Sequence, residues 1–146
     1  MLKLASTYLI VKDIKKSVEF YEALLQMKVS KQNDDRWAQF DFGGCIALYN
    51  PRYDEERIAQ AKDLQGHYSK ELIEYYRNRE IRYGSHFVLN FYTEDLSTEY
   101  ERVKGLNIGK ISGIFFVNIS SPYHFFLLED PDGNTLEVTG PQGKVY

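Results

Sequence analysis

The stretch Phe125-Phe-Leu-Leu-Glu-Asp-Pro-Asp-Gly-Asn-Thr-Leu-Glu137 predicts an antiparallel hairpin in this sequence of 146 residues. Two runs of strand-forming residues flank the segment 130–134. Pro131 presets the backbone angle φ of a turn, and Gly133 accepts the positive φ that many turns require. We therefore expect two strands joined by a tight turn, with Glu137 on the second strand.

The chain repeats one arrangement of strand and helix. Leu9–Asp13 reads as a strand ending in an aspartate that can cap the next helix, and Phe91–Asp95 repeats it 82 residues later. Apolar residues follow each aspartate at spacings of three or four, which predicts one buried stripe on each helix. They are Ile14, Val18, Tyr21, Leu24 and Leu25 in the first copy, and Leu96, Tyr100, Val103 and Leu106 in the second. Strand-like segments closed by a glycine turn follow, so each copy reads as a strand, a helix and then two or three antiparallel strands.

The two copies resemble the modules of the glyoxalase/bleomycin resistance/dioxygenase superfamily, also called vicinal oxygen chelate proteins. The resemblance rests on Val11-x-Asp13…Ser17-x-x-Phe20-Tyr21-x-x-Leu24 and on Asp130-Pro-Asp-Gly-Asn-x-Leu-Glu137. It implies an α+β fold in which two βαβββ modules form a curved mixed sheet around a cleft. We expect a single domain over residues 1–146, with module one at 1–50, a helical connection at 51–83 and module two at 84–146.

The connection between the modules predicts two helices. The first begins near Pro51 and the acidic run 54–56, Gly66 breaks it, and the second runs from Ser69 to near 83–84. Three arginines interleaved with tyrosines are interpreted as a solvated helix face rather than an anion-binding strip: Arg77, Arg79 and Arg82. The connection itself is interpreted as a spacer that covers the sheet edge, with a lid or a dimer contact as the alternative.

The composition argues against several classes of partner. A net charge of −3 and a pI near 5.6 give no basic field for nucleic acid or an anionic membrane. We expect neither a signal peptide nor a membrane span. The one cysteine, Cys45, cannot form an internal disulfide, which favours a cytoplasmic location. Aromatic residues make up 15% of the chain, a supply that suits either a thick core or a pocket for a planar ligand.

Strand alternation predicts which side chains face the cleft. The resemblance implies ligand positions seven residues before each capping aspartate, which are Ser6 and Val88 here, and one near Ala47 after the Gly43-Gly44 turn. Glu137 is the one position that matches a metal-ligand type. We expect the cleft to be lined by Ser6, Tyr8, Trp37, Ala47, His86, Val88, Asn90, Tyr92, Phe125, Leu127 and Glu137.

We expect no catalytic metal and no cofactor. A divalent catalytic ion generally needs at least three protein ligands, and Ser6, Ala47 and Val88 supply none of the usual donors. His86 shares parity with Val88, but two strand residues span about 6.6 Å, far beyond the roughly 2 Å of a metal–nitrogen bond. A shifted register or a bulge would bring it into place. His124 is expected on the face opposite Phe125.

Three functions remain open at this point, and no catalytic residue is assigned. We favour a metal-free small-molecule-binding protein, similar to the bleomycin-resistance branch, that holds a planar or cationic ligand. A metal-dependent lyase, thiol transferase or dioxygenase would instead use Glu137 as a ligand. A non-catalytic interaction module would use residues 51–83 as its contact surface. The resemblance also implies a homodimer.

Overall fold

Two compact units make up the chain in the computed structural model, which describes residues 6–60, 64, 67, 68, 70–84, 88–118 and 122–143. The first unit contains Met1–Val18 and Met27–Tyr83, and the second contains Glu19–Gln26 and Gly84–Tyr146. The boundary at Gly84 coincides with the expected start of the second module. Helix α1 (Ile14–Leu25) contributes its first residues to the first unit and the rest to the second.

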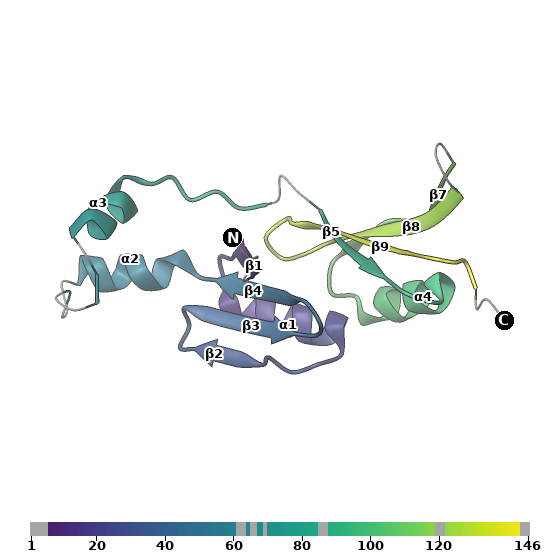
Figure 1. Cartoon of the computed structure of the whole chain (residues 1–146), viewed down its shortest axis with the longest axis horizontal. Coiled ribbons are helices and arrows are strands. Elements are labelled where there is room, and N and C mark those ends of the chain that lie inside the picture. The colour runs from purple at the N-terminus through teal and green to yellow at the C-terminus, as the bar shows by residue number, and fades with distance from the viewer. Residues whose placement is uncertain are drawn as a thin grey trace, which may run out of the picture. The chain divides into compact units, whose positions relative to one another are not determined.

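The first unit is built on a four-stranded mixed sheet (Figure 1). Its strands lie in the order β1-β4-β3-β2, and they are β1 (Thr7–Ile10), β2 (Lys31–Asn33), β3 (Trp37–Asp41) and β4 (Cys45–Tyr49). β1 is parallel to β4, whereas β4–β3 and β3–β2 are antiparallel. Because side chains alternate along a strand, one face collects the buried apolar residues that form the core: Leu9, Ala38, Phe40, Ile46 and Leu48.

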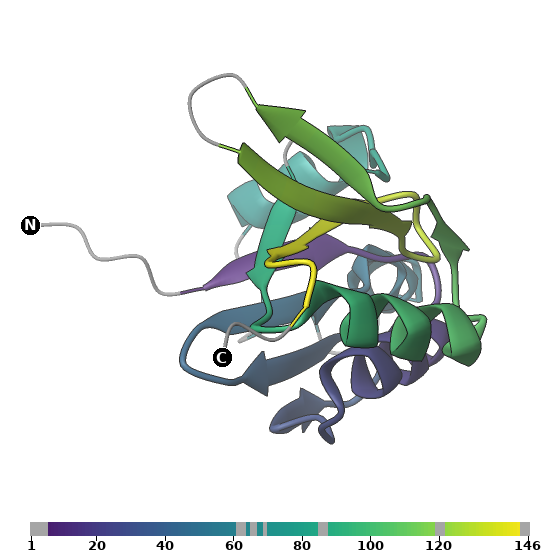
Figure 2. The ribbon, with the colours of Figure 1, turned by 90° about the vertical axis from the view of Figure 1, so that its right-hand side faces the viewer.

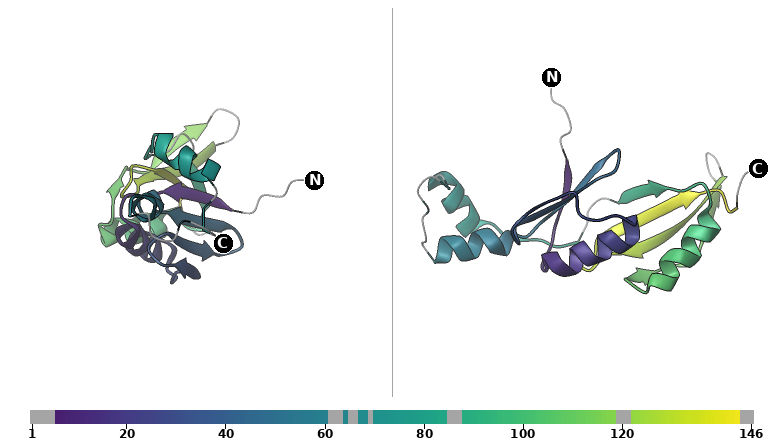
Figure 3. Two further views of the ribbon diagram at one scale, coloured as in Figure 1. Left: turned by 90° about the vertical axis from the view of Figure 1, so that its left-hand side faces the viewer. Right: turned by 90° about the horizontal axis from the view of Figure 1, so that it is seen from below.

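The second unit contains a five-stranded mixed sheet. Its order is β5-β9-β8-β6, with β7 also paired to β8, and the strands are β5 (Leu89–Tyr92), β6 (Lys110–Ile111), β7 (Phe115–Asn118), β8 (Pro122–Glu129) and β9 (Thr135–Gly140). Helix α4 (Leu96–Leu106) lies along one face of this sheet (Figure 2 and Figure 3, right). The Tyr100 ring packs edge-on against Phe126 at 5.3 Å between centroids. The core of this unit is therefore the face that carries Phe126, Leu128, Leu136 and Val138.

The repeat predicted from the sequence is confirmed as an α+β fold of two similar modules. Strand β1 and strand β5 begin and end 82 residues apart, and so do the first residues of α1 and α4. In each sheet, the strand that comes first in the chain lies at one edge and pairs in parallel with the strand that comes last. The strands between them in sequence lie on the other side of that last strand. Strand β7 is an addition in the second module.

The two repeated aspartates cap their helices as predicted. The carboxylate of Asp13 accepts hydrogen bonds from the backbone N–H groups of Lys15 and Lys16, at 3.1 and 3.2 Å. Asp95 accepts from the backbone N–H of Thr98 at 3.1 Å and from its hydroxyl at 2.9 Å. These bonds satisfy backbone donors that a helix leaves unpaired in its first turn. Each aspartate thus fixes where its helix begins.

The predicted turn between β8 and β9 is closed by the buried carboxylate of Asp130. One carboxylate oxygen accepts from the backbone N–H groups of Asp132 and Asn134, at 2.9 and 2.8 Å. The other accepts from the Asn134 side-chain amide and from the Tyr21 hydroxyl, both at 2.8 Å. Gly133 takes the positive φ of +83° that the turn requires. The turn is therefore held both by its own backbone and by helix α1.

The connection contains two helices, α2 (Pro51–Ala59) and α3 (Lys70–Asn78), that lie side by side (Figures 1 and 3). The expectation that the second helix continues to residues 83–84 is wrong, because it ends at Asn78. The Asn78 amide donates to the carbonyl of Glu74 at 2.9 Å, the kind of side-chain contact with the backbone that makes asparagine a poor residue inside a helix. Gly66 and Ser69 lie outside the described residues.

We predict that Tyr21→Phe lowers the free energy of unfolding by about 1–2 kcal/mol, because it removes a buried donor to the Asp130 carboxylate and leaves the ring in place. Urea denaturation measures the change. Tyr92→Phe is the matched control, since Tyr92 is 73% exposed, and it should change stability by less than about 0.5 kcal/mol. Equal stability of Tyr21→Phe and the unchanged protein would contradict a structural role for this bond.

Candidate functional site

The open face of the second sheet brings together five of the eleven predicted ligand-contacting residues. Register pairing places Asn90, Glu137 and Leu127 in one row across β5, β9 and β8. The next row contains Tyr92, Thr139 and Phe125 and extends to Phe115 on β7. Both rows lie on the face opposite the buried core, because their positions alternate with Phe126 and Val138. This face is therefore a surface of aromatic and polar side chains.

A short hydrogen bond organises the polar part of this face. The side-chain amide of Asn90 donates to Oε1 of Glu137 at 2.6 Å, across the parallel β5–β9 pair. Thr139 lies one pleat further along β9, and its hydroxyl donates to the carbonyl of Phe91 at 3.3 Å. The sequence predicted that Asn90 and Glu137 share a face. It gave no signal that they contact each other, because the two residues are 47 positions apart.

The aromatic part of the same face is open. Tyr92 is 73% exposed, and the rings of Phe125 and Phe115 are tilted against each other at 5.5 Å between centroids. Val88, just before β5, is half exposed. These rings present flat apolar surface beside the carboxylate of Glu137.

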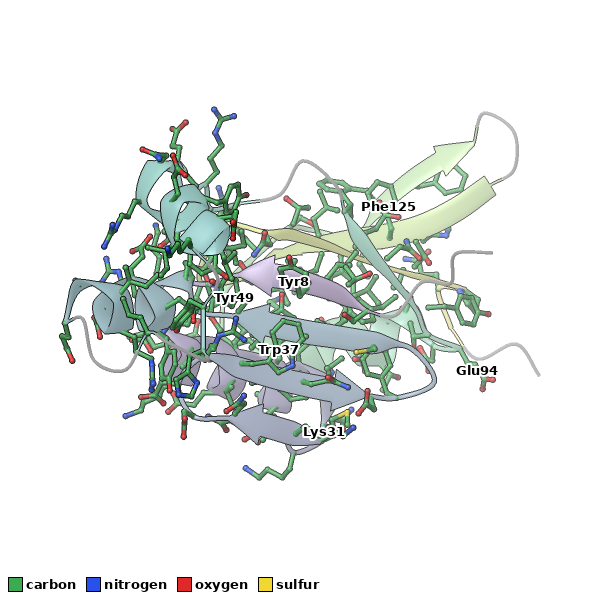
Figure 4. The ribbon with its side chains drawn as sticks, turned by 60° about the vertical axis from the view of Figure 1, so that its left-hand side comes forward. Tyr8, Lys31, Trp37, Tyr49, Glu94 and Phe125 are labelled. Atoms are coloured by element: carbon green, nitrogen blue, oxygen red, sulfur yellow. The ribbon has the colours of Figure 1, made fainter. Side chains whose placement is uncertain are left out.

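The face of the first sheet opposite Leu9 and Leu48 carries the other described residues of the predicted set. Tyr8 and Ala47 are register neighbours on β1 and β4, and Trp37 lies on β3 opposite Tyr49. The Tyr8 ring packs against Trp37 at 5.4 Å and edge-on against Tyr49 at 6.2 Å (Figure 4). Tyr8 is about half exposed, whereas Ala47 is fully buried. Ser6 directly precedes β1 and is partly buried.

Comparison with known proteins gives the family. The sequence pattern of the glyoxalase/bleomycin resistance protein/dioxygenase superfamily matches residues 3–138. The chain belongs to this superfamily. None of the functionally curated proteins compared with it matches its sequence.

Solved structures similar to this superfamily member share its fold. A protein from the mobile metagenome of V. Pseudocholerae is 27% identical with a TM-score of 0.62, covering 96% of this chain and 95% of that one. Lactoylglutathione lyase from Agrobacterium tumefaciens is 15% identical with a TM-score of 0.63, covering 96% and 94%. A bleomycin resistance determinant encoded on the transposon Tn5 is 15% identical with a TM-score of 0.59, covering 97% and 99%.

Three of the four residues at the superfamily's implied metal positions are not usual ligands of a catalytic ion. Ala47 and Val88 have hydrocarbon side chains, Ser6 offers a hydroxyl, and Glu137 is already hydrogen-bonded to Asn90. Among the described residues, no group of three or more His, Cys, Asp or Glu side chains could hold a metal ion. His86, the alternative donor, lies outside the described residues.

The other two histidines have different surroundings. His124 lies on the face opposite Phe125, as strand alternation predicts, with its ring 4.7 Å from that of Phe116. His67 borders a cavity beside α2 and α3. Within the described residues, no helix is long and apolar enough to cross a membrane.

A buried cluster around Asp54 was not predicted from the sequence. The carboxylate of Asp54, in the first turn of α2, is fully buried. It accepts from Nε of Arg36 at 2.9 and 3.1 Å, from the Tyr49 hydroxyl at 2.7 Å and from the Tyr68 hydroxyl at 2.8 Å. In the sequence, Asp54 reads as one of three acidic residues at a helix start. Its donors are 18, 5 and 14 positions away, so no local pattern could identify the cluster.

Arg79 extends this cluster, and the interpretation that it belongs to a solvated helix face is wrong. Its side chain is 13% exposed, and its guanidinium carbon lies 4.0 Å from the centroid of the Tyr76 ring. Nη2 of Arg79 donates to the Tyr49 hydroxyl at 3.3 Å, which in turn donates to Asp54. The short helix α3 ends before Arg79, so this side chain packs against α2 and β4 residues instead of following a solvated stripe.

The hydrogen bonds at Asp54 control ionisation in the cluster. Burial opposes the charged form of Asp54, but the bonds from Arg36, Tyr49 and Tyr68 outweigh it and lower the pKa of the carboxyl from its ordinary value of 3.8. Burial and the bond to Asp54 raise the pKa of Tyr68 to about 12. Burial, followed by the bond to Asp54, also raises the pKa of Tyr49. The cluster is thus an ionised carboxylate surrounded by protonated donors at neutral pH.

We predict that Asp54→Asn lowers the free energy of unfolding by about 2–3 kcal/mol at neutral pH, since it leaves the partly exposed Arg36 without its ion partner. It should also return the pKa of Tyr68 from about 12 towards the ordinary value near 10. Urea denaturation and titration of the tyrosinate absorbance measure these changes. Glu55→Gln on the same helix is the control and should leave the pKa of Tyr68 unchanged.

The effect on stability should depend on pH with a defined sign. Because the folded pKa of Asp54 is lower than its unfolded value, the ionised carboxylate stabilises the fold above about pH 4 and this contribution disappears as the pH falls through the folded pKa. The stability difference between the unchanged protein and Asp54→Asn should therefore shrink in acid. A difference that stays constant down to the acid transition would contradict the assignment.

Proposed function

We propose that this superfamily member binds a small organic molecule on the open face of its second sheet, with Glu137 as the acceptor that orients the ligand and without a catalytic metal. The observation that supports this most directly is the Asn90–Glu137 hydrogen bond of 2.6 Å beside exposed aromatic rings. A carboxylate held in position by a neighbouring amide is suited to direct recognition of a donor group.

The carboxylate of Glu137 keeps most of its acceptor capacity. An ionised carboxylate offers about four lone-pair positions. Within the described part of the chain, the Asn90 amide is the hydrogen-bond donor that contacts it. A ligand with an N–H group or a positive charge would therefore find both an acceptor and a favourable charge at this point.

The surrounding rings favour a planar ligand. Tyr92 is largely exposed, and Phe125 packs against Phe115, so the face offers stacking surface in the row next to Glu137. Aromatic faces attract cations as well as flat apolar groups. Leu127, next to Glu137 across the sheet, adds apolar surface. Together these groups favour a planar aromatic cation over an anion or an aliphatic compound.

The metal-free character of the proposal rests on the side chains themselves. Two of the implied ligand positions, Ala47 and Val88, cannot coordinate an ion through their side chains. An enzyme that polarises substrate oxygens through a metal would need donors that these positions lack. A role of Glu137 in binding a ligand directly does not require further metal-coordinating side chains.

We also propose that the chain forms a homodimer in the cytoplasm. Phe116 on β7 is 58% exposed, and among the described strands β7 is paired to β8 alone. An exposed aromatic on a strand with one open edge is suited to contact with a second copy. The single cysteine, Cys45, fits a reducing compartment.

We predict that trimethylphenylammonium and benzamidinium raise the melting temperature of the protein, whereas benzoate does not. Glu137→Gln keeps the size of the side chain and removes its charge, so it should weaken binding of either cation by about tenfold in calorimetric titration. Glu101→Gln, on the exposed part of α4, is the charge-matched control and should bind as the unchanged protein does. Equal binding of benzoate and the cations, or full affinity in Glu137→Gln, would contradict the proposed role of the carboxylate.

A further inference from the structure

A polar cavity of about 480 Å³ lies in the first unit, where α2 and α3 meet the end of β2. The side chains that matter for its chemistry come from three places: Asp34 and Arg36 from the β2–β3 turn, Tyr53 and Arg57 from α2, and His67 and Leu72 at the start of the α3 region. None of the residues assigned above to ligand binding is among those that line it. The helical connection and the β2–β3 turn thus form a concave site together.

Arg36 presents an unused binding group to this cavity. It contacts the buried Asp54 through Nε alone, at 2.9 and 3.1 Å. Within the described part of the chain, no hydrogen bond engages its two terminal amino groups, and its side chain is 35% exposed. Asp54 and the Tyr49 ring, 5.3 Å from the guanidinium carbon, hold this group in one orientation. Two parallel N–H donors in a fixed plane match the geometry of a carboxylate.

The Tyr53 hydroxyl connects a second cation, Arg57, with an anion, Asp34, on the cavity wall. Nη1 of Arg57 donates to the Tyr53 hydroxyl at 3.4 Å, and this hydroxyl donates to Oδ2 of Asp34 at 3.0 Å. Asp34 is exposed and sits at the turn with a positive φ of 47°. Arg57 and Asp34 therefore lie on either side of one hydroxyl group. The cavity wall carries charges of both signs at fixed positions.

We propose that this cavity binds a free α-amino acid, with the ligand carboxylate on Arg36 and Arg57 and the ligand ammonium on Asp34. Asp54 is neutralised by Arg36 and two tyrosine hydroxyls, so Asp34 is the carboxylate that remains to meet a positive charge. A compact dianion such as phosphate would meet the two arginines but also the repulsion of Asp34. A zwitterion satisfies both kinds of group at once.

The size and lining of the cavity agree with a small polar ligand. A volume of about 480 Å³ lies within the range of small-molecule sites. Leu72 supplies the aliphatic part of the lining, and the tyrosine rings supply the remaining apolar surface. Amino acids with short or aliphatic side chains are therefore expected to bind better than large charged ones.

Calorimetric titration of the full-length protein with glycine, L-alanine, L-serine and L-leucine, each separately, tests this proposal. We expect at least one of them to bind with a dissociation constant on the order of 1 mM or below. Acetate and ethylammonium carry one of the two charges each, and they should bind at least about tenfold more weakly. Inorganic phosphate should not compete with the amino acid.

Two variants locate the site without disturbing the buried Asp54. Asp34→Asn tolerates the positive φ and keeps an acceptor for Tyr53, while it removes the charge. Arg57→Gln removes the second cation. Each should weaken amino-acid binding about tenfold. Arg52→Gln on the same helix is the control for Arg57→Gln and should bind the amino acid as the unchanged protein does. Glu137→Gln should also bind it normally, which distinguishes this site from the one proposed above.

Several results would overturn the proposal. The absence of binding by all four amino acids would exclude it. Acetate or phosphate binding as tightly as the amino acid would show a plain anion site. Full affinity in both Asp34→Asn and Arg57→Gln would place the ligand elsewhere on the protein. In each variant, an unchanged melting temperature confirms that the loss of binding does not arise from loss of the fold.

Discussion

The hydrogen bonds of the Asp130 carboxylate are the constraint on which the second unit depends. Four donors converge on this buried group, three from its own turn and one from Tyr21 on helix α1. They fix the turn, and the turn fixes the register of β8 against β9. A slip of β9 by one residue against β8 would move Glu137 from the open face to the core face. Burial and the adjacent Asp130 raise the pKa of Tyr21 well above its ordinary value, which keeps its hydroxyl a donor.

Local sequence patterns were sufficient to predict features that depend only on the residues of one segment, such as helix caps and turns. Asp13 and Asp95 precede apolar stripes of helical period, and both cap their helices as predicted. Pro131 and Gly133 mark a turn that the structure confirms. Because side chains alternate along a strand, these fixed points also set which residues of each strand share a face, whereas the pairing of Asn90 with Glu137 and of Tyr8 with Ala47 is visible only in the structure.

The sequence could not predict contacts that depend on the packing of distant segments. Asp54 comes three residues after a proline and directly before two glutamates, the usual composition of an exposed helix start, yet its carboxylate is fully buried among donors from the β2–β3 turn, β4 and the region before α3. The end of α3 at Asn78 and the burial of Arg79 likewise depend on contacts with other segments of the chain. Propensity describes a segment alone, whereas these features arise from the groups that pack against it. The connection is thus a structured part of the first unit.

The claim that this superfamily member holds its ligand without a catalytic metal can be tested by native mass spectrometry. The protein is measured as purified without added metal, and again after incubation with Ni²⁺, Zn²⁺, Mn²⁺ or Fe²⁺ and removal of the excess ion. We expect a dimer that retains no ion in a fixed ratio, because the side chains of Ala47 and Val88 add no donor to that of Glu137. One ion retained per chain, and lost in Glu137→Gln, would contradict it and make Glu137 a metal ligand.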